Sequence, residues 1–231
     1  MSNPMYTTHA TEYAKVVKNN IYNAHLERPT TLSLLDIQPQ QKVLDLGCGS
    51  GEHAKAIQSQ GGVVTCVDLS PQMIELVNAN IQPHHAYVQD LSAGLPNEEE
   101  GTYDWVIAPL VIHYIEDITA LFKEIKRVLK PGGQWVFSTH HPLNDFAVSP
   151  SGNYFALEHI SELWDTIGKP LPVSYYRRSL QDLFAAIHDA GFVVSQLSEG
   201  APSPEIADRD PETYLRLTTQ PSFVYMRCFL L

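Results

Sequence analysis

A short apolar run that leads straight into three alternating glycines constrains the fold of this chain more than any other feature. Residues 43 to 51 read Val-Leu-Asp-Leu-Gly-Cys-Gly-Ser-Gly, and an amphipathic pattern follows them. Gly47, Gly49 and Gly51 permit positive φ angles and carry no Cβ atom that would hold a bound molecule away from the backbone. Because ligands of open α/β sheets bind beyond the carboxyl ends of the strands, the stretch predicts a strand, a ligand-binding turn and a helix.

The rest of the chain alternates short β-branched runs with longer amphipathic ones, which is typical of an α/β fold with a parallel sheet. The pattern predicts strands over 42–46, 63–67, 85–89, 103–108, 134–139, 192–197 and 223–229, and helices over 51–60, 71–80, 118–129 and 179–190. The 231 residues suit a single domain. Residues 1–40 and 140–177 do not fit the alternation, so we expect an N-terminal helical cover and a lid inserted after the fifth strand. The Pro-containing link 199–221 is expected to be irregular.

Charge and composition exclude several kinds of partner. The chain has 15 Lys+Arg and 26 Asp+Glu, a net charge of −11, which argues against binding nucleic acid because phosphates require clustered cations. No secretory signal is visible and the run 105–115 is too short to cross a bilayer, so we expect a cytoplasmic protein without a membrane partner. The three cysteines lack metal-ligand spacing, so we expect free thiols and no metal. We expect a monomer or a homodimer.

Two classes of ligand compete for the glycine turn. A dinucleotide fingerprint, G-x-G-x-x-G, requires glycine at position 52, but the residue there is Glu52, whose carboxylate would repel a pyrophosphate at the helix start. A cationic nucleoside without phosphate, such as S-adenosylmethionine, avoids that repulsion. Asp68, at the end of the second strand, is well placed to accept hydrogen bonds from a ribose diol. Asp90, after the third strand, is the corresponding acceptor for an adenine amino group.

These motifs together resemble the class I S-adenosylmethionine-dependent methyltransferases, particularly the small-molecule branch labelled methyltransferase type 11. The resemblance covers roughly residues 41–139 and rests on the glycine stretch, Asp68, Gln89-Asp90, the run Tyr-Asp-Trp-Val-Ile-Ala at 103–108 and the turn Leu-Lys-Pro-Gly-Gly at 129–133. It implies a Rossmann-like seven-stranded sheet of order 3-2-1-4-5-7-6, with the last strand antiparallel and helices on both faces. It also implies S-adenosylmethionine as cofactor and S-adenosylhomocysteine as product. The residues that it assigns to the cofactor are Tyr13, Asp45, Gly47, Cys48, Gly49, Gly51, Asp68, Leu69, Met73, Asp90, Leu91, Ala108 and His113.

Methyl transfer from a sulfonium requires alignment, exclusion of water and, for some acceptors, a base. The candidate bases are His113, after the fourth strand, and His140 and His141, after the fifth; the alternative is that each caps backbone or borders the cofactor. After the fourth strand the chain reads Ala-Pro-Leu-Val at 108–111, not the Asn/Asp-Pro-Pro-Tyr/Phe of many nucleic-acid amino-methyltransferases. That departure and the acidic charge favour a small-molecule acceptor, with oxygen, nitrogen, carbon or sulfur as the methylated atom.

Aromatic residues gather between positions 146 and 176, where the lid is expected. Trp164 and Tyr176 are our candidates for contact with the substrate, and the alternative is that these rings form the core of the lid itself. We interpret Arg177 and Arg178 as a solvated helix start, and the alternative is that they bind a carboxylate of the acceptor. Three other functions stay open: a non-catalytic or regulatory cofactor-binding protein, an NAD-dependent oxidoreductase, and a protein or tRNA methyltransferase.

Overall fold

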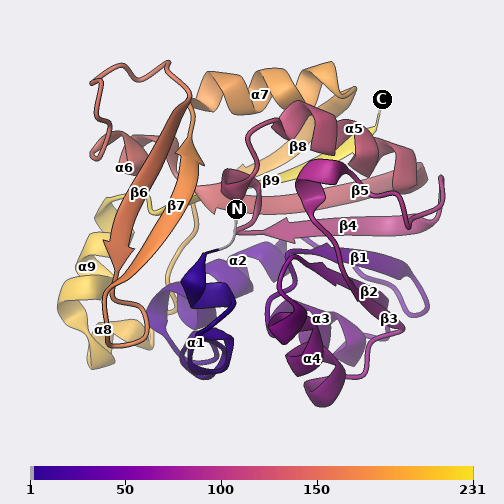
Figure 1. Cartoon of the computed structure of the whole chain (residues 1–231), viewed down its shortest axis with the longest axis horizontal. Helices are drawn as coiled ribbons and strands as arrows, with labels where there is room; N and C mark the ends of the chain where they lie inside the picture. Colours follow the sequence, from indigo (N-terminus) through magenta and orange to yellow (C-terminus); the bar gives the residue numbers. More distant parts are fainter. Residues whose placement is uncertain (1–2, 231) are drawn as a thin grey trace.

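The computed structural model, which describes residues 3–230, is built on a seven-stranded sheet of order β3-β2-β1-β4-β5-β9-β8 (Figure 1). Its strands are β1 (Lys42–Leu46), β2 (Val63–Asp68), β3 (His85–Val88), β4 (Tyr103–Pro109), β5 (Leu129–His140), β8 (Phe192–Ser198) and β9 (Phe223–Leu230). β9 pairs antiparallel with β5 and with β8, and the other pairings are parallel. Because β8 and β9 are the sixth and seventh strands of this sheet, the predicted order and the antiparallel last strand are confirmed.

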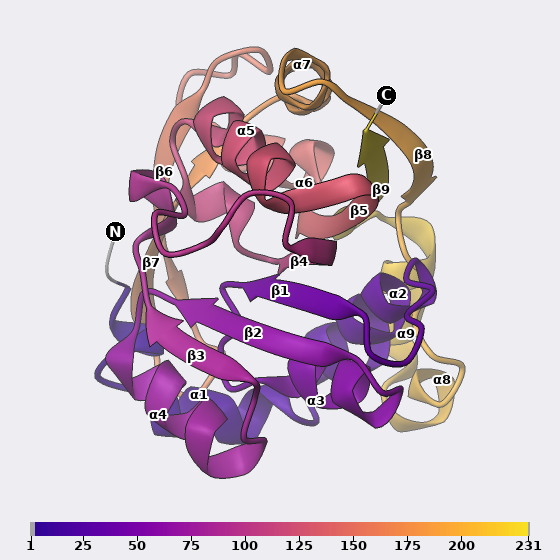
Figure 2. The same cartoon turned by 90° about the vertical axis from the view of Figure 1, so that its right-hand side faces the viewer.

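Helices cover both faces of the sheet, and the buried apolar side chains form one cluster on each face (Figure 2). One face carries α5 (Ile118–Val128) and α7 (Leu180–Asp189), and the other carries α2 (Arg28–Ser33), α3 (Glu52–Ser59), α4 (Pro71–Asn80) and α9 (Pro211–Thr219). Since side chains alternate along a strand, Leu44 and Leu46 of β1 enter the cluster under α5 and α7, whereas Val43 enters the opposite one.

Local signals explain why the predicted helices begin where they do. Ser70 caps α4 by accepting a hydrogen bond from the Met73 N–H at 3.2 Å, and Pro71 occupies the first helical position. α7 begins with a capping box in which the Ser179 hydroxyl and the Asp182 carboxylate each bind the other residue's backbone N–H. The four predicted helices lie within two residues of the observed bounds.

β5 begins five residues earlier than predicted. Leu129 pairs with Tyr103 at the start of β4, and the register then shifts so that Gln134 pairs with Trp105. The Lys-Pro-Gly-Gly turn at 130–133 therefore forms a bulge within β5, where we expected only a loop between helix and strand.

Two stretches contain elements that the sequence did not predict. Residues 140–177 form α6 (Pro142–Phe146) and a separate hairpin of β6 (Glu158–Trp164) and β7 (Leu171–Arg177). The link 199–221, expected to be irregular, contains α8 (Ile206–Arg209) and α9, and Asp210 caps α9 by accepting from the Thr213 N–H at 3.0 Å.

The segment before β1 forms η1 (Pro4–Tyr6), α1 (Ala10–Val17), the π-helix η2 (Asn23–Glu27) and α2. The remaining short turns are η3 (Leu91–Ala93) and η4 (Ile112–Tyr114).

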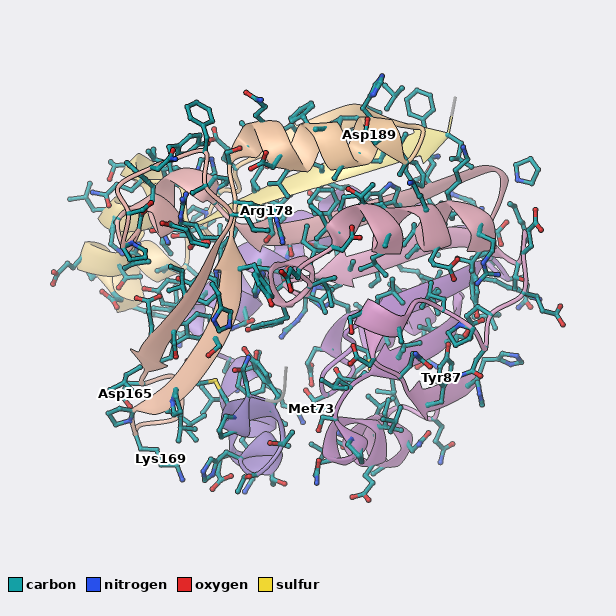
Figure 3. All side chains as sticks on the ribbon, turned by 45° about the horizontal axis from the view of Figure 1, so that its top comes forward. Met73, Tyr87, Asp165, Lys169, Arg178 and Asp189 are labelled. Carbon is teal, nitrogen blue, oxygen red and sulfur yellow. The ribbon has the colours of Figure 1, made fainter. Side chains whose placement is uncertain are left out.

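The interpretation of Arg177 and Arg178 as a solvated helix start is wrong. Arg177 is 0% exposed and donates to Glu158 Oε2 at 2.7 Å, and Arg178, labelled in Figure 3 at the junction of β7 and α7, is 6% exposed. The Arg178 guanidinium donates to the carbonyl oxygens of Ile112 at 3.2 Å and Ile115 at 2.6 Å, and burial lowers the pKa of Arg178 to about 10. Carbonyl groups from distant loops converge on both side chains, which no local pattern encodes.

None of the helices within residues 3–230 combines the length and the apolar character that crossing a bilayer requires. In the same range no group of three or more potential ligands is arranged to hold a metal ion. Cys48, Cys66 and Cys228 are all free thiols, as expected.

Candidate functional site

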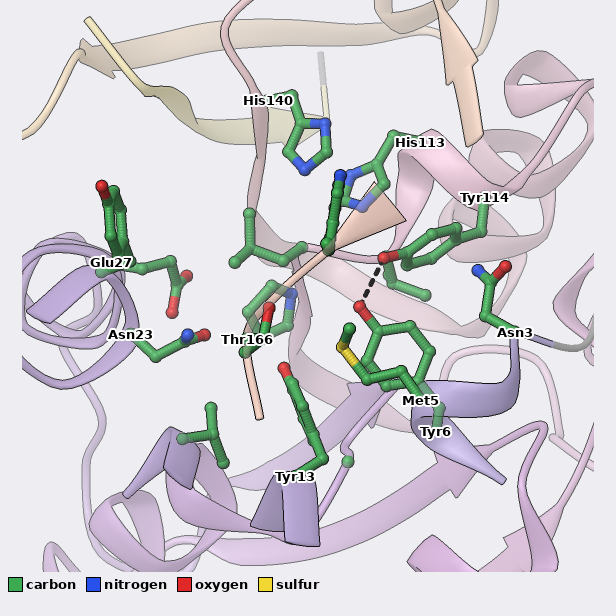
Figure 4. A pocket seen from close by; sticks show the side chains of 18 of the residues that line it. Asn3, Met5, Tyr6, Tyr13, Asn23, Glu27, His113, Tyr114, His140 and Thr166 are labelled. Atoms are coloured by element: carbon green, nitrogen blue, oxygen red, sulfur yellow. Dashed lines mark hydrogen bonds between the residues drawn. The ribbon is translucent and has the colours of Figure 1, made fainter. Parts of the chain in front are cut away.

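A cavity of about 880 Å³ lies at the carboxyl ends of β1, β2, β4 and β5 (Figure 4). Its floor is formed by the glycine turn after β1 and by the residues that follow the other strands. The N-terminal segment from η1 to η2, one face of the β6–β7 hairpin and residues of α9 form the remaining walls. The site is therefore enclosed by segments from both ends of the chain.

The three glycines of the turn have different environments. All have positive φ angles, of 68° at Gly47, 54° at Gly49 and 87° at Gly51. A Cβ atom at Gly47 would lie 2.5 Å from Val111, and one at Gly51 would lie 2.9 Å from Ile81, whereas none of the described atoms comes within 4 Å of one at Gly49. Gly47 and Gly49 line the cavity and Gly51 does not. Close packing therefore explains why glycine is needed at positions 47 and 51. At Gly49 no described side chain is close, and bare backbone faces the cavity.

Asp68 connects the end of β2 to this turn. Its Oδ2 accepts a hydrogen bond from the Gly49 N–H at 2.9 Å and its Oδ1 accepts one from the Ser70 N–H at 2.8 Å. Burial raises the pKa of Asp68 above its ordinary value, although these N–H donors favour the charged form. The other cavity-lining residues among those predicted for the cofactor are Tyr13, Cys48, Leu69, Met73, Asp90, Leu91 and His113.

Asp45 and Ala108 do not line the cavity, although we predicted both for the cofactor. Side-chain alternation along β1 directs Asp45 to the face covered by α3, where it is 0% exposed. Burial raises the pKa of Asp45 to about 7; the nearby carboxylates of Asp68 and Glu27 add to the shift, and His53 opposes it. Alternation along β4 likewise buries Ala108 in the cluster under α5 and α7.

A buried charged group that sequence reasoning missed borders the cavity. Glu27 Oε1 accepts hydrogen bonds from the hydroxyls of Thr31 and Ser138, both at 2.7 Å, and its Oε2 lies 3.0 Å from His53 Nε2. Burial acts to raise the pKa of Glu27, but His53 and the two hydroxyls hold it below its ordinary value. Asn23 and Glu27 both face the cavity from the π-helix η2, a helix type frequent at functional sites.

The N-terminal segment closes one side of the cavity. Tyr6 stacks edge-on against Tyr13, and its hydroxyl lies 2.6 Å from the Tyr114 hydroxyl (Figure 4). The Asn3 side chain forms two hydrogen bonds with the backbone of Ser174 in β7, at 2.9 and 3.2 Å. The segment is thus attached both to the turn after β4 and to the hairpin. In the sequence, the tyrosines at positions 6, 13 and 22 are a signal for this wall, and all three line the cavity.

The three candidate histidines separate into two environments. His113 and His140 line the cavity and their rings stack with centroids 4.0 Å apart. His113 Nδ1 lies 3.3 Å from the Thr139 hydroxyl, and burial, reinforced by His140 and Arg178, lowers the pKa of His113 well below its ordinary value. His140 Nδ1 lies 3.4 Å from Asp145 Oδ1.

His141 does not line the cavity. Its Nδ1 accepts a hydrogen bond from the Leu143 N–H at 3.2 Å at the start of α6, and its Nε2 lies 3.0 Å from Glu199. His141 therefore caps the start of α6, which was the alternative to a role as base, and it does not face the cavity.

Of the two aromatic residues predicted for the substrate, Trp164 lines the cavity and Tyr176 does not. Alternation along β7 turns Tyr175 into the cavity instead, and the Tyr175 hydroxyl donates to Glu162 at 2.5 Å. Tyr176 lies on the other face of the hairpin and donates to Glu116 at 3.0 Å. The β-branched and aromatic residues Val173, Tyr175 and Tyr176 are a signal that could have revealed this strand, but which of its faces meets the cavity depends on the pairing.

Comparison with known proteins relates the chain to methyltransferases. Residues 44–137 match the family model described as a methyltransferase domain. An uncharacterized methyltransferase of Synechocystis is 31% identical over 166 residues, which cover 71% of this chain and 72% of that protein. A malonyl-[acyl-carrier protein] O-methyltransferase of Serratia marcescens is 32% identical over 102 residues, which cover 44% of this chain and 39% of that protein.

Several curated relatives are longer than the segment they share with this chain. An uncharacterized protein of Haemophilus influenzae is 34% identical over 143 residues, and the match spans only 55% of its length. Among solved structures, an S-adenosylmethionine-dependent methyltransferase from Mesorhizobium loti has a TM-score of 0.70 at 22% identity, covering 92% of this chain and 99% of that one. This likeness concerns the fold.

Proposed function

The chain belongs to the class I S-adenosylmethionine-dependent methyltransferases of the type 11-like group, and from this premise we propose that it methylates a small-molecule acceptor held in the cavity under the β6–β7 hairpin. The observation that carries the proposal is the bare backbone of Gly49, which faces the cavity while its N–H is held by Asp68. In this proposal the N-terminal segment acts as a cover and residues 140–177 act as a lid.

The residues around the glycine turn fit the cofactor. A nucleoside can approach the backbone at Gly49, where a Cβ atom would project into open space. Asp68 would accept hydrogen bonds from the ribose hydroxyls with the lone pairs that its two backbone donors leave free. Asp90, Leu69 and Met73 would border the adenine, as the family resemblance implies.

Arg28 is the residue that we assign to the carboxylate of the cofactor. It lines the cavity, its Nη2 donates to the Val17 carbonyl at 3.0 Å, and its buried Nε has no hydrogen-bond partner among the described residues. A buried guanidinium N–H without a partner is costly, and a carboxylate would satisfy it with a charge-assisted hydrogen bond.

The reaction needs little chemistry from the chain itself. S-adenosylmethionine supplies a methyl group activated by a positively charged sulfur. The chain aligns the acceptor and excludes water, which the N-terminal wall and the hairpin would do together. We assign the role of base to His140, because it lines the cavity and its Nδ1 lies 3.4 Å from Asp145 Oδ1, a contact that would orient the ring. His113, stacked on it, would be kept neutral by its lowered pKa.

The environment of Glu52 disfavours a nicotinamide cofactor. Glu52 begins α3 and lines the cavity, so its carboxylate stands where a helix N-terminus would bind a pyrophosphate. A sulfonium meets no such repulsion there.

The proposal is tested by titrating the protein with S-adenosylmethionine and S-adenosylhomocysteine in a calorimeter, and by measuring S-adenosylhomocysteine release with a panel of small metabolites. We expect binding of both compounds and turnover with at least one acceptor. Asp68→Asn should weaken cofactor binding by about 1.5–3 kcal/mol, because the ribose loses a charged acceptor. Asp104→Asn, at the opposite end of the sheet, is the control.

The outcomes separate the alternatives. Absence of cofactor binding would overturn the proposal, as would binding of NAD in place of S-adenosylmethionine. Tight cofactor binding without turnover of any acceptor would favour the non-catalytic, regulatory function.

A further inference from the structure

We propose that the acceptor is an amine that is protonated in solution and is joined to an apolar or aromatic group, and that Asp145 and Glu162 bind its ammonium. The inference rests on the proposed function, because it names the acceptor class for the same cavity. The inference is argued from the carboxylates and the aromatic side chains that form the cavity wall around His140.

Two carboxylates that have no lysine or arginine partner among the described residues face this part of the cavity. Asp145, in α6, is 6% exposed, and its Oδ1 lies 3.4 Å from His140 Nδ1. Glu162, in β6, accepts the hydrogen bond from the Tyr175 hydroxyl at 2.5 Å. No lysine or arginine within residues 3–230 forms an ion pair with either carboxylate. Asp145 is buried and Glu162 is half-buried, and a ligand that brings a positive charge would give both carboxylates an ionic partner.

Aromatic rings surround the same space. The His140 ring centroid lies 5.0 Å from that of Tyr175, 5.5 Å from that of Trp164 and 6.3 Å from that of Phe223. Trp164 and Tyr175 are themselves 5.9 Å apart, and all of these residues line the cavity. Ring faces attract ammonium groups and pack against apolar groups, so the wall suits both halves of such an amine.

The cationic side chains of the cavity do not offer a site for an anionic acceptor. Arg28 and Arg216 are its only lysines or arginines among the described residues. Arg216 donates to the Tyr22 hydroxyl at 2.7 Å and lies over the Tyr22 ring, 5.3 Å from its centroid. Arg28 is the residue assigned to the cofactor carboxylate. A carboxylate or phosphate acceptor would therefore face Asp145 and Glu162 without a free cation to bind it.

The transfer step balances with these residues. The bound ammonium gives one proton to His140, whose other ring nitrogen faces Asp145, and the neutral amine then holds a free lone pair. That lone pair forms the new N–C bond to the methyl group while the C–S bond breaks, and the electron pair of the broken bond stays on sulfur. The products are an N-methylammonium ion and neutral S-adenosylhomocysteine, and the proton on His140 passes to solvent.

The test uses matched probes with benzyl, phenylethyl and indolylethyl groups, each as the amine, the alcohol and the carboxylate. Binding of each probe is measured by calorimetry at pH 7.5 on the full chain saturated with S-adenosylhomocysteine. We expect at least one amine to bind about tenfold or more tightly than its alcohol and carboxylate analogues, since a charge-assisted contact is worth at least that factor. The inference would be overturned if none of the three amines bound more tightly than its own alcohol and carboxylate analogues. It would also be overturned if none of the probes bound at all.

Variants assign the effect to the two carboxylates. Asp145→Asn and Glu162→Gln keep the shape of each side chain and should each reduce amine affinity about tenfold without changing affinity for the alcohols. Glu116→Gln is the matched control, because Glu116 accepts from Tyr176 on the opposite face of the same hairpin and should leave amine affinity unchanged. Equal amine affinity in all variants would overturn the assignment.

The two proposals fail in different ways. S-adenosylhomocysteine affinity is measured on every variant, both as a check of folding and as a test of the cofactor site. Loss of cofactor binding in the parent protein contradicts the proposed function, whereas normal cofactor binding with no preference for amines contradicts only the acceptor class.

Discussion

The hydroxyl of Tyr6 lies 2.6 Å from the hydroxyl of Tyr114, so the beginning of the chain is joined to the turn that follows β4. Burial raises the pKa of both phenols, so each is a neutral donor and acceptor at physiological pH. The pair forms part of the cavity wall, and one of its members comes from a segment outside the alternating α/β core.

We predict that Tyr6→Phe and Tyr114→Phe each destabilise the protein by about 1–2 kcal/mol, because each leaves the other hydroxyl buried without its partner. The double variant should cost little more than either single variant, which gives a coupling energy of about 1 kcal/mol. Urea denaturation of the four proteins measures this cycle. Strictly additive effects would contradict the hydrogen bond as a stabilising contact.

The different surroundings of Gly47 and Gly49 predict different effects of the same substitution. Both Gly47→Ala and Gly49→Ala should cost about 1–2 kcal/mol of stability because of their positive φ angles. At Gly47 the overlap with Val111 should add about 1–3 kcal/mol, whereas at Gly49 the new methyl group meets open space. Gly49→Ala should therefore be the more stable variant and should still lose cofactor affinity. Denaturation and calorimetric titration together distinguish the two, and tight cofactor binding by Gly49→Ala would contradict our placement of the ligand.

Asp45 predicts a specific dependence of stability on pH. A carboxyl group whose pKa is about 7 in the folded protein, against about 4 in the unfolded chain, binds its proton more tightly when folded. Its contribution to the free energy of unfolding is therefore greatest below about pH 4, falls as the pH rises to about 7, and is constant above. The substitution Asp45→Asn removes this pH-dependent contribution to the free energy of unfolding.

The measurement is the free energy of unfolding of the parent and of Asp45→Asn between pH 5 and pH 8. The free energy of unfolding of the variant minus that of the parent should rise by about 2–4 kcal/mol from pH 5 to pH 8. Taking this difference at each pH cancels the effect of the other titrating groups. A difference that does not change with pH would show that Asp45 has an ordinary pKa.

Arg178 is expected to position His113 and to influence its protonation. Arg178→Gln should destabilise the protein by about 2–4 kcal/mol, because the carbonyl groups of Ile112 and Ile115 lose their donors. Removal of the positive charge should also raise the pKa of His113, although burial, which is the larger cause, should keep it below the ordinary value.

An NMR titration of the His113 ring in the two proteins measures that shift directly. The same titration of His188, which is exposed in α7, is the control and should not change. An unchanged pKa of His113 in Arg178→Gln would contradict the electrostatic contact and leave Arg178 a purely structural role.

The sequence by itself determined the sheet, its strand order through the family resemblance, and the glycine turn with Asp68 beside it. These features are encoded locally, because the period of apolar residues specifies each strand and helix, and a glycine that needs a positive φ angle is recognisable where it stands. For the same reason the capped helices α4 and α7 were predicted nearly to the residue.

Only the tertiary structure decided which side chains meet in the cavity. Tyr175 rather than Tyr176 faces it because strand pairing determines which of two alternating faces is turned inward, and a change of one position reverses the assignment. Arg178 is buried because carbonyl groups more than sixty residues away converge on it. The contact of His140 with Asp145, and the position of Glu162 in the same cavity, likewise depend on how α6 and the hairpin pack over the sheet, which no local period of the sequence records.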